Sequence, residues 1–81
     1  MTDQEIMAAI TEAVREEIEN PAIQLRPETT ASQIPGWDSL AHVRIIFNIE
    51  ARVGADIDMN ETYKAANIGE LAALVRSKVP R

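Results

Sequence analysis

The sequence predicts an all-α fold, namely a four-helix bundle with three main helices, one short helix and a long first loop. Apolar residues recur at the three- and four-residue spacing of helices in three segments of the chain. Prolines and glycines stand between these segments, where they stop helices. The alternating pattern that marks β-strands is poorly represented. At 81 residues the chain has room for one small domain, residues 1–81.

The first predicted helix opens with a capping box. Thr2-Asp3-Gln4-Glu5 places a hydroxyl and a carboxylate three residues apart, so each can bind a free backbone amide of the first turn. Pro21 is expected to end the helix near Glu19 or Asn20, because the residue before a proline avoids the α region. One apolar face repeats every four residues: Ile6, Ile10, Val14 and Ile18.

The segment from Ala22 to Trp37 shows no sustained periodicity and contains Pro27, Pro35 and Gly36. A loop of this length is uncommon within a compact domain and is usually functional. Three apolar residues are expected to hold it against the core: Ile23, Leu25 and Ile34.

The second helix is expected to begin at Asp38 or Ser39 and to end at about Val53, where Gly54 provides a stop. Its apolar residues cover more of the circumference than a surface helix needs: Leu40, Val43, Ile45, Ile46, Phe47, Ile49 and Val53. The helix is therefore either central to the bundle or partly exposed as a docking surface.

The last part of the chain is expected to hold a polar turn at residues 56–60, a short helix over Glu61 to Ala66, and a final helix. Asn67-Ile68-Gly69-Glu70 begins that final helix with a second capping pattern, and Pro80 prevents its continuation. Three cations lie where they suit a helix C-terminus: Arg76, Lys78 and Arg81. The predicted core comprises Ile6, Ile10, Val14, Leu40, Val43, Ile57, Ile68, Leu71 and Val75.

Composition narrows the classes of function. Thirteen acidic and eight basic residues give a formal net charge of −5, which disfavours binding to nucleic acid. The acidity favours a partner with a basic docking surface, or it simply keeps a small protein in solution. No segment approaches the roughly 18 consecutive apolar residues of a membrane span, and the first ten residues lack the pattern of a signal peptide. The absence of cysteine is consistent with a cytoplasmic protein, which we expect to be monomeric.

Two catalytic or metal-binding patterns are incomplete. Asp38, Ser39 and His42 have the residue types of a hydrolase triad, but three side chains on one helical turn rarely converge as a triad requires. We expect His42 to be a surface or partly buried histidine and the chain itself not to be an enzyme. Residues 56–60 open like a calcium loop, yet the positions that should be glycine and glutamate are Glu61 and Asn67, so no metal site is expected.

Gly36-Trp37-Asp38-Ser39-Leu40 is the remaining segment whose residues could carry chemistry. It places a hydroxyl in the first turn of a helix, directly after a long loop, where the hydroxyl is freely approached. Asp38 can act as N-cap for that helix. A phosphodiester on Ser39 would lie near the positive end of the helix dipole. Alternatively, Ser39 is an ordinary residue of a helix start.

With this motif, the chain resembles the acyl carrier protein family over nearly its whole length. Asp38-Ser39-Leu40 resembles the triplet that begins the second of four helices in that family. Several later residues are also similar to the family's pattern: Val43, Ile46, Ile49, Glu50, Ile57 and the segment 67–71. The resemblance implies that a phosphopantetheinyl transferase attaches 4′-phosphopantetheine covalently to Ser39, and that Asp38 caps the helix and helps the transferase to recognise it.

The resemblance further implies that the protein holds acyl or aminoacyl intermediates as thioesters on this arm. An acyl or aminoacyl ligase would load it, and a downstream acyltransferase or synthase would receive the cargo. Four residues of the second helix are predicted to meet these partners: Leu40, Val43, Arg44 and Phe47. The charge of this helix is mixed, whereas carriers of fatty-acid synthesis usually have a markedly acidic one, so a stand-alone aminoacyl, peptidyl or polyketide carrier is favoured. The alternative is a small non-catalytic helical adaptor that presents the apolar surface of the second helix.

Overall fold

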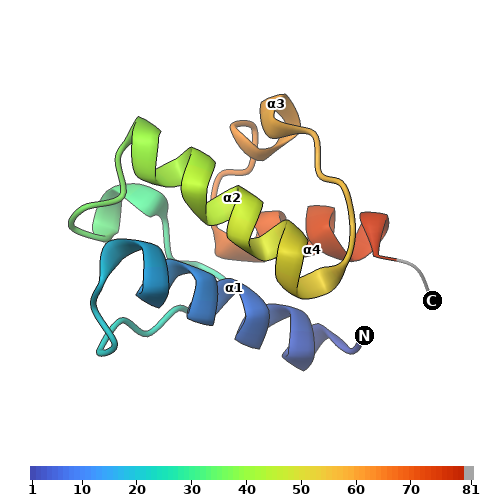
Figure 1. The fold of residues 1–81 in the computed structure, drawn as a ribbon, viewed down its shortest axis with the longest axis horizontal. Helices are drawn as coiled ribbons and strands as arrows, with labels where there is room; N and C mark the ends of the chain where they lie inside the picture. The colour runs from blue at the N-terminus through green and yellow to red at the C-terminus, as the bar shows by residue number, and fades with distance from the viewer. Residues whose placement is uncertain (80–81) are drawn as a thin grey trace.

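Helices make up the body of the structure (Figure 1). The computed structural model describes residues 1–79, and it contains α1 (Asp3–Ile18), α2 (Ser39–Val53), α3 (Met59–Thr62), α4 (Ile68–Lys78) and a 3₁₀ turn, η1 (Ala31–Gln33). No strand occurs within residues 1–79. Helices α1 and α2 lie side by side, α4 packs against α1, and α3 lies next to α4. The prediction of an all-α bundle with three main helices, one short helix and a long first loop is confirmed.

The predicted capping box of α1 is present. Glu5 N donates to Thr2 Oγ1 (3.1 Å), and Thr2 N donates to Glu5 Oε1 (2.8 Å). The bond from the Thr2 amide holds the pKa of the Glu5 carboxyl below its usual value. The helix ends at Ile18, slightly earlier than predicted, because Glu19 adopts the left-handed conformation with φ 59°.

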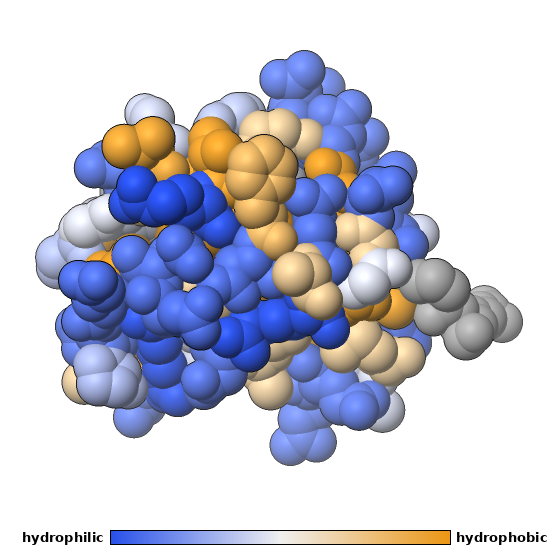
Figure 2. All heavy atoms as spheres, in the orientation of Figure 1, coloured by the Kyte–Doolittle hydropathy of each residue, from blue (hydrophilic) through white to orange (hydrophobic). Residues whose placement is uncertain are grey.

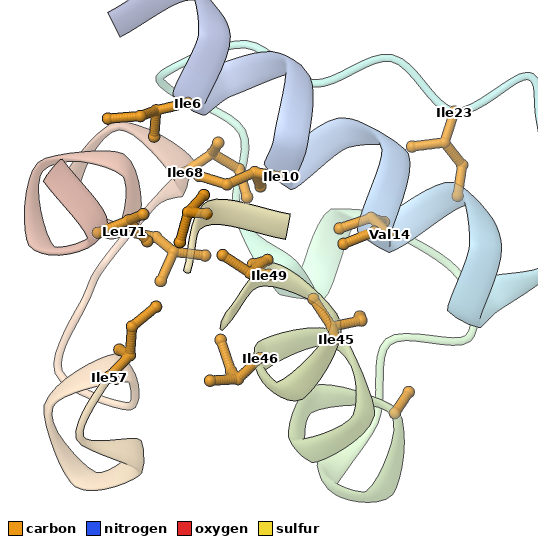
Figure 3. Close-up of a cluster of buried hydrophobic side chains, with 14 residues drawn as sticks. Ile6, Ile10, Val14, Ile23, Ile45, Ile46, Ile49, Ile57, Ile68 and Leu71 are labelled. Carbon is orange, nitrogen blue, oxygen red and sulfur yellow. The ribbon is translucent and has the colours of Figure 1, made fainter. Parts of the chain in front are cut away.

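Aliphatic side chains from α1, α2 and α4 meet in one core, which Ile57 joins from the loop before α3 (Figure 3). The expectation that Ile23 is buried and that Leu25 and Ile34 pack against the core is confirmed. The buried apolar residues are Ile6, Ile10, Ala13, Val14, Ile23, Ala41, Ile45, Ile46, Ile49, Val53, Ile57, Ile68, Leu71 and Val75.

Two residues of the predicted core were placed wrongly. Leu40 is exposed and Val43 is only half-buried. The buried side of α2 instead contains the row Ala41, Ile45 and Ile49, which repeats every four residues, and also Ile46 and Val53. Because apolar residues surround much of α2, its sequence alone does not select the buried row. Packing against α1 selects it.

Backbone bonds tie the first loop to α4. Ile68 N donates to Thr29 O and Gly69 N donates to Pro27 O, each at 2.8 Å. The turn η1 within this loop, at Ala31–Gln33, was not predicted. The loop is therefore an ordered strap across the bundle, which ends directly before α2 (Figure 1).

The short helix α3 begins and ends earlier than predicted. It spans Met59–Thr62 instead of Glu61 to Ala66 because Asp58 caps it, accepting a bond from Asn60 N (2.8 Å). Thr62 is the buried polar residue of this helix.

Helix α4 begins where the capping pattern predicted. Glu70 N donates to Asn67 Oδ1 (2.9 Å), while the Glu70 carboxylate accepts from the preceding amide, Ala66 N (3.1 Å). At the other end, Arg76 pairs with Asp3 at the start of α1. The expected roles of Pro80 and Arg81 lie outside the described residues. Within residues 1–79, none of the helices has the length and apolarity that crossing a membrane requires.

Candidate functional site

The chain approaches α2 through a tight turn at Gly36. Its φ is +93°, a left-handed conformation that side chains rarely adopt. A Cβ at this position would lie 3.2 Å from Ile18 Cγ2 at the end of α1. The turn therefore presses the loop against α1 and fixes the direction in which α2 begins.

Asp38 is the N-cap of α2, as the sequence predicted. Its backbone is extended (φ −103°, ψ −174°), and its Oδ1 accepts from Ala41 N at 2.8 Å. The next intrahelical bond runs from His42 N to Asp38 O (2.8 Å). Asp38 thus satisfies one free amide of the first turn with its side chain, as good N-cap residues do.

Ser39 is the first residue of α2, and it is exposed. Its hydroxyl stands at the end of the helix where the unpaired amides and the positive end of the dipole lie. A phosphate ester on this oxygen would be stabilised by that positive end and would point into solvent. The geometry is therefore compatible with a covalently attached anionic group at Ser39.

Apolar side chains follow Ser39 along the outward side of α2. Leu40 is 66% exposed and Phe47 is 59% exposed, and Val43 lies half-buried between them in sequence. Figure 2 shows hydrophobic side chains along α2 above a band of hydrophilic atoms that separates them from α1. Leu40, Val43 and Phe47 are three and four residues apart, so they lie on one side of α2 and form an apolar strip that begins next to Ser39.

The basic residues of α2 turn toward α1. Arg44 Nε lies 3.7 Å from Glu17 Oε1, and Arg52 Nη2 lies 3.0 Å from Glu16 Oε2. Asn48 bridges the same two glutamates, donating to Glu16 Oε1 (3.0 Å) and Glu17 Oε2 (2.8 Å). The mixed charge predicted for α2 therefore belongs to a network shared with α1. Arg44 remains half-exposed at its edge.

His42 is engaged on both ring nitrogens, and neither bond goes to Ser39 or Asp38. Trp37 Nε1 donates to His42 Nδ1 (3.1 Å), and His42 Nε2 lies 2.8 Å from Thr62 Oγ1. Burial lowers the pKa of the His42 imidazole. The structure brings together Asp38 and Ser39 at the helix start but turns His42 away from them, so the three residues do not form a triad.

This hydrogen-bonded chain is the part of the site that sequence reasoning missed. Trp37, His42 and Thr62 come from the first loop, α2 and α3, so no local sequence pattern predicts that they meet. The available signal was weak: the chain has one tryptophan and one histidine, five residues apart. A cavity of about 40 Å³ lies beside these hydrogen bonds. Trp37, His42 and Thr62 line it together with apolar residues of η1, α4 and the loop before α4.

A small helical bundle that presents an exposed, capped serine at the start of its second long helix has the architecture of a carrier protein. The chain is 34% identical to a solved holo acyl carrier protein from Geobacter metallireducens, with a TM-score of 0.79 over 90% of this chain and 84% of that chain. It is also 24% identical to a curated acyl carrier protein from Exiguobacterium sp., over 98% of this chain and 100% of that protein. No family model matches the sequence. The chain belongs to the acyl carrier protein family, and its role is that of a carrier.

Proposed function

We propose that this chain carries acyl or aminoacyl groups as thioesters on a 4′-phosphopantetheine arm attached to Ser39, and that it delivers them to partner enzymes. The observation that carries the proposal is the exposed Ser39 hydroxyl at the first position of α2, capped by Asp38, in a chain of the acyl carrier protein family. The solved relative is itself a holo form. Residues 1–81 would act as one carrier domain, in the cytoplasm and as a monomer.

The residues present fit such an arm. Ser39 supplies the oxygen that is esterified, and the start of α2 stabilises the negative phosphodiester. Asp38 keeps the first turn formed and offers a carboxylate for recognition by the transferase. When bound, the arm supplies a terminal thiol, which is the nucleophile that the chain itself lacks, since it contains no cysteine.

The protein's own contribution beyond attachment is recognition. The strip formed by Leu40, Val43 and Phe47 offers an apolar contact close to the arm, and Arg44 stands at its edge. A transferase, a loading ligase and a downstream acyltransferase or synthase would meet the same strip in turn. Contacts of this kind give specificity when their charges are complementary.

Intact mass is the direct test of attachment. Protein incubated with coenzyme A and a broad-specificity phosphopantetheinyl transferase should gain the mass of one arm, and the gain should map to Ser39. Ser39→Ala should abolish the gain and leave the helical content unchanged, because the side chain is exposed. A gain that persists in Ser39→Ala would refute the assignment. An unmodified wild type that still binds a partner through Leu40 and Phe47 would favour the small helical adaptor.

Partner choice is tested at Arg44. An enzyme that grips an acidic helix would meet a like charge at this position, so we expect poor loading by fatty-acid synthesis enzymes and efficient loading by a dedicated ligase. Arg44→Glu should raise the rate of loading by the fatty-acid synthesis enzymes and lower the rate of loading by the dedicated ligase.

The matched control for this test is Arg52→Glu. This variant also removes an ion pair with α1. Arg52, however, lies eight residues further along α2, about 12 Å from Arg44. Equal loading rates for wild type and Arg44→Glu would contradict the assignment of Arg44 to the partner surface. So would equal effects of the two charge reversals.

A further inference from the structure

Three consecutive residues anchor the backbone directly before Ser39. Gly36 lies against Ile18 of α1, Trp37 reaches forward to His42, and Asp38 caps the first turn of α2. Backbone bonds reinforce the turn, since Trp37 N donates to Ile34 O (3.2 Å) and Asp38 N to Gly36 O (3.1 Å). The side chain of Ser39 is exposed, yet the position of its backbone is set by this turn.

The anchor at Trp37 continues into α3. The indole Nε1–H only donates, so His42 Nδ1 must accept, and in the neutral ring the proton then resides on Nε2. Nε2–H donates to Thr62 Oγ1 (2.8 Å), and Thr62 Oγ1 donates to Met59 O (2.6 Å). In this series of hydrogen bonds each donor points the same way, from Trp37 in the loop through His42 of α2 to Thr62 of α3.

Because the donors all point the same way, protonation of His42 breaks this series of hydrogen bonds. A proton on His42 Nδ1 would place two donors, Nδ1–H and the Trp37 indole N–H, opposite each other. The bond between them would be lost, because neither group can accept. The bond from Nε2–H to Thr62 would remain. Protonation therefore breaks the bond between Trp37 and His42 and keeps the bond between His42 and Thr62.

The surroundings of the ring favour the neutral form. Tyr63, the residue directly after α3, stacks on the imidazole with ring centroids 4.6 Å apart, and it is the titratable group that contacts the ring from that side. On α2 itself, the Asp38 carboxylate lies one turn away and is engaged by Ala41 N. The remaining groups around the adjoining cavity carry no charge: Ala31 from η1, Ala65, Ala66 and Asn67 from the loop, and Ile68 and Leu71 from α4.

We propose that Trp37 and His42 are positioning residues for the modification of Ser39, and that Thr62 couples them to α3, so that a neutral His42 holds the start of α2 in place and a protonated His42 frees Trp37. The proposal rests on Ser39 being the attachment site. It adds a link between α3 and the serine, two parts of the molecule that are separated in sequence by twenty residues or more.

The chain offers unambiguous probes, because it has a single tryptophan and a single histidine. In an NMR pH titration of the wild-type protein, the Trp37 indole N–H and the Ser39 backbone amide should shift with the same midpoint as the His42 ring. That midpoint should lie below the ordinary histidine value, since burial disfavours the charged ring. An indole or a Ser39 amide that stays unchanged while His42 titrates would overturn the proposal.

Two variants test positioning by kinetics. Trp37→Phe removes the donor to Nδ1, and Thr62→Val removes the acceptor from Nε2–H with little change of volume. Each should lower kcat for attachment of the arm by about two- to tenfold, the range of one hydrogen bond, with KM nearly unchanged. Thr11→Val is the matched control, because it removes a half-buried hydroxyl that donates to Met7 O within α1. It should leave kcat unchanged.

A third variant separates the bond to Trp37 from the bond to Thr62. His42→Gln can still donate an N–H toward Thr62 but offers no ring nitrogen to Trp37, so it should resemble Trp37→Phe in kcat. Equal loss of kcat in Thr11→Val and Thr62→Val would overturn the proposal, as would normal kcat in Trp37→Phe. If the wild type takes up no arm at all, the proposed function fails, whereas the NMR titration still decides whether the histidine controls the position of Ser39.

Discussion

The inward and outward faces of α2 differ in chemistry and in what they do for the protein. The inward row of Ala41, Ile45 and Ile49 is buried, and α2 packs against α1. Ile45 and Ile49 lie in the core (Figure 3). The outward strip begins beside Ser39 with Leu40 and continues to Phe47, both largely exposed. One helix thus contributes both to the core of the bundle and to the surface that follows Ser39, the proposed attachment point. Changes on the first face should act on folding and changes on the second on partners.

The largest effect is expected from the inward face. Ile49→Ala should lower the free energy of unfolding by about 2–5 kcal/mol, because it opens a cavity where the side chain is fully buried. Leu71→Ala, in α4, should cost a similar amount, because Leu71 is buried in the same core. Chemical denaturation measures both, and for so small a domain either loss is a large share of the total stability. A near-neutral Leu71→Ala would mean that α4 presents a different face to the core.

An intermediate effect is expected at the junction of the two faces. Asp38→Ala removes the bond to Ala41 N and should cost about 1 kcal/mol of stability. It should also slow attachment of the arm, since the first turn is the part of α2 that frays. Asp38→Asn is the control, because an amide oxygen still caps. An Asn variant as unstable as the Ala variant would show that the charge, not the cap, matters.

A smaller, pH-dependent effect is expected from His42. Its pKa in the folded protein is lowered from the ordinary value of 6.5, so the unfolded chain binds its proton more readily. Its stabilising contribution is therefore fully present above about pH 6.5 and is lost as the pH falls through the folded pKa. Denaturation of wild type and His42→Gln across this range should show a difference that shrinks toward acid pH. A constant difference would contradict the assigned neutral ring.

The smallest effect on stability is expected on the outward face. Phe47→Ala should change the free energy of unfolding by no more than about 0.5 kcal/mol, because the ring is exposed. The same change should slow loading by a partner ligase, since an apolar contact beside the arm is lost. Thermal denaturation and loading rates separate the two quantities. A destabilised Phe47→Ala with normal loading would reverse the roles given to the two faces.

The sequence by itself determined most of the helices and the place of Ser39 at the start of the second one. Capping chemistry is local, so Thr2, Asp38 and Asn67 marked three helix starts correctly, and Gly54 ends α2 in the left-handed conformation (φ 68°). The motif around Ser39 was likewise readable, because its residues are contiguous in the chain. The short α3 was misplaced, because a side-chain cap at Asp58 outweighed weak helical periodicity, and the 3₁₀ turn η1 was not predicted.

The tertiary structure decided which face of α2 is buried and what His42 does. Apolar residues surround much of α2, so the choice of the inward row depended on the surface of α1 and not on α2 itself. Leu40 is therefore exposed to solvent, although a leucine side chain is apolar enough for a core. The partners of His42 come from the first loop and from α3, and Thr62 lies twenty residues away along the chain. Periodicity and capping act over a few residues, whereas contacts of this kind exist only once the helices have packed.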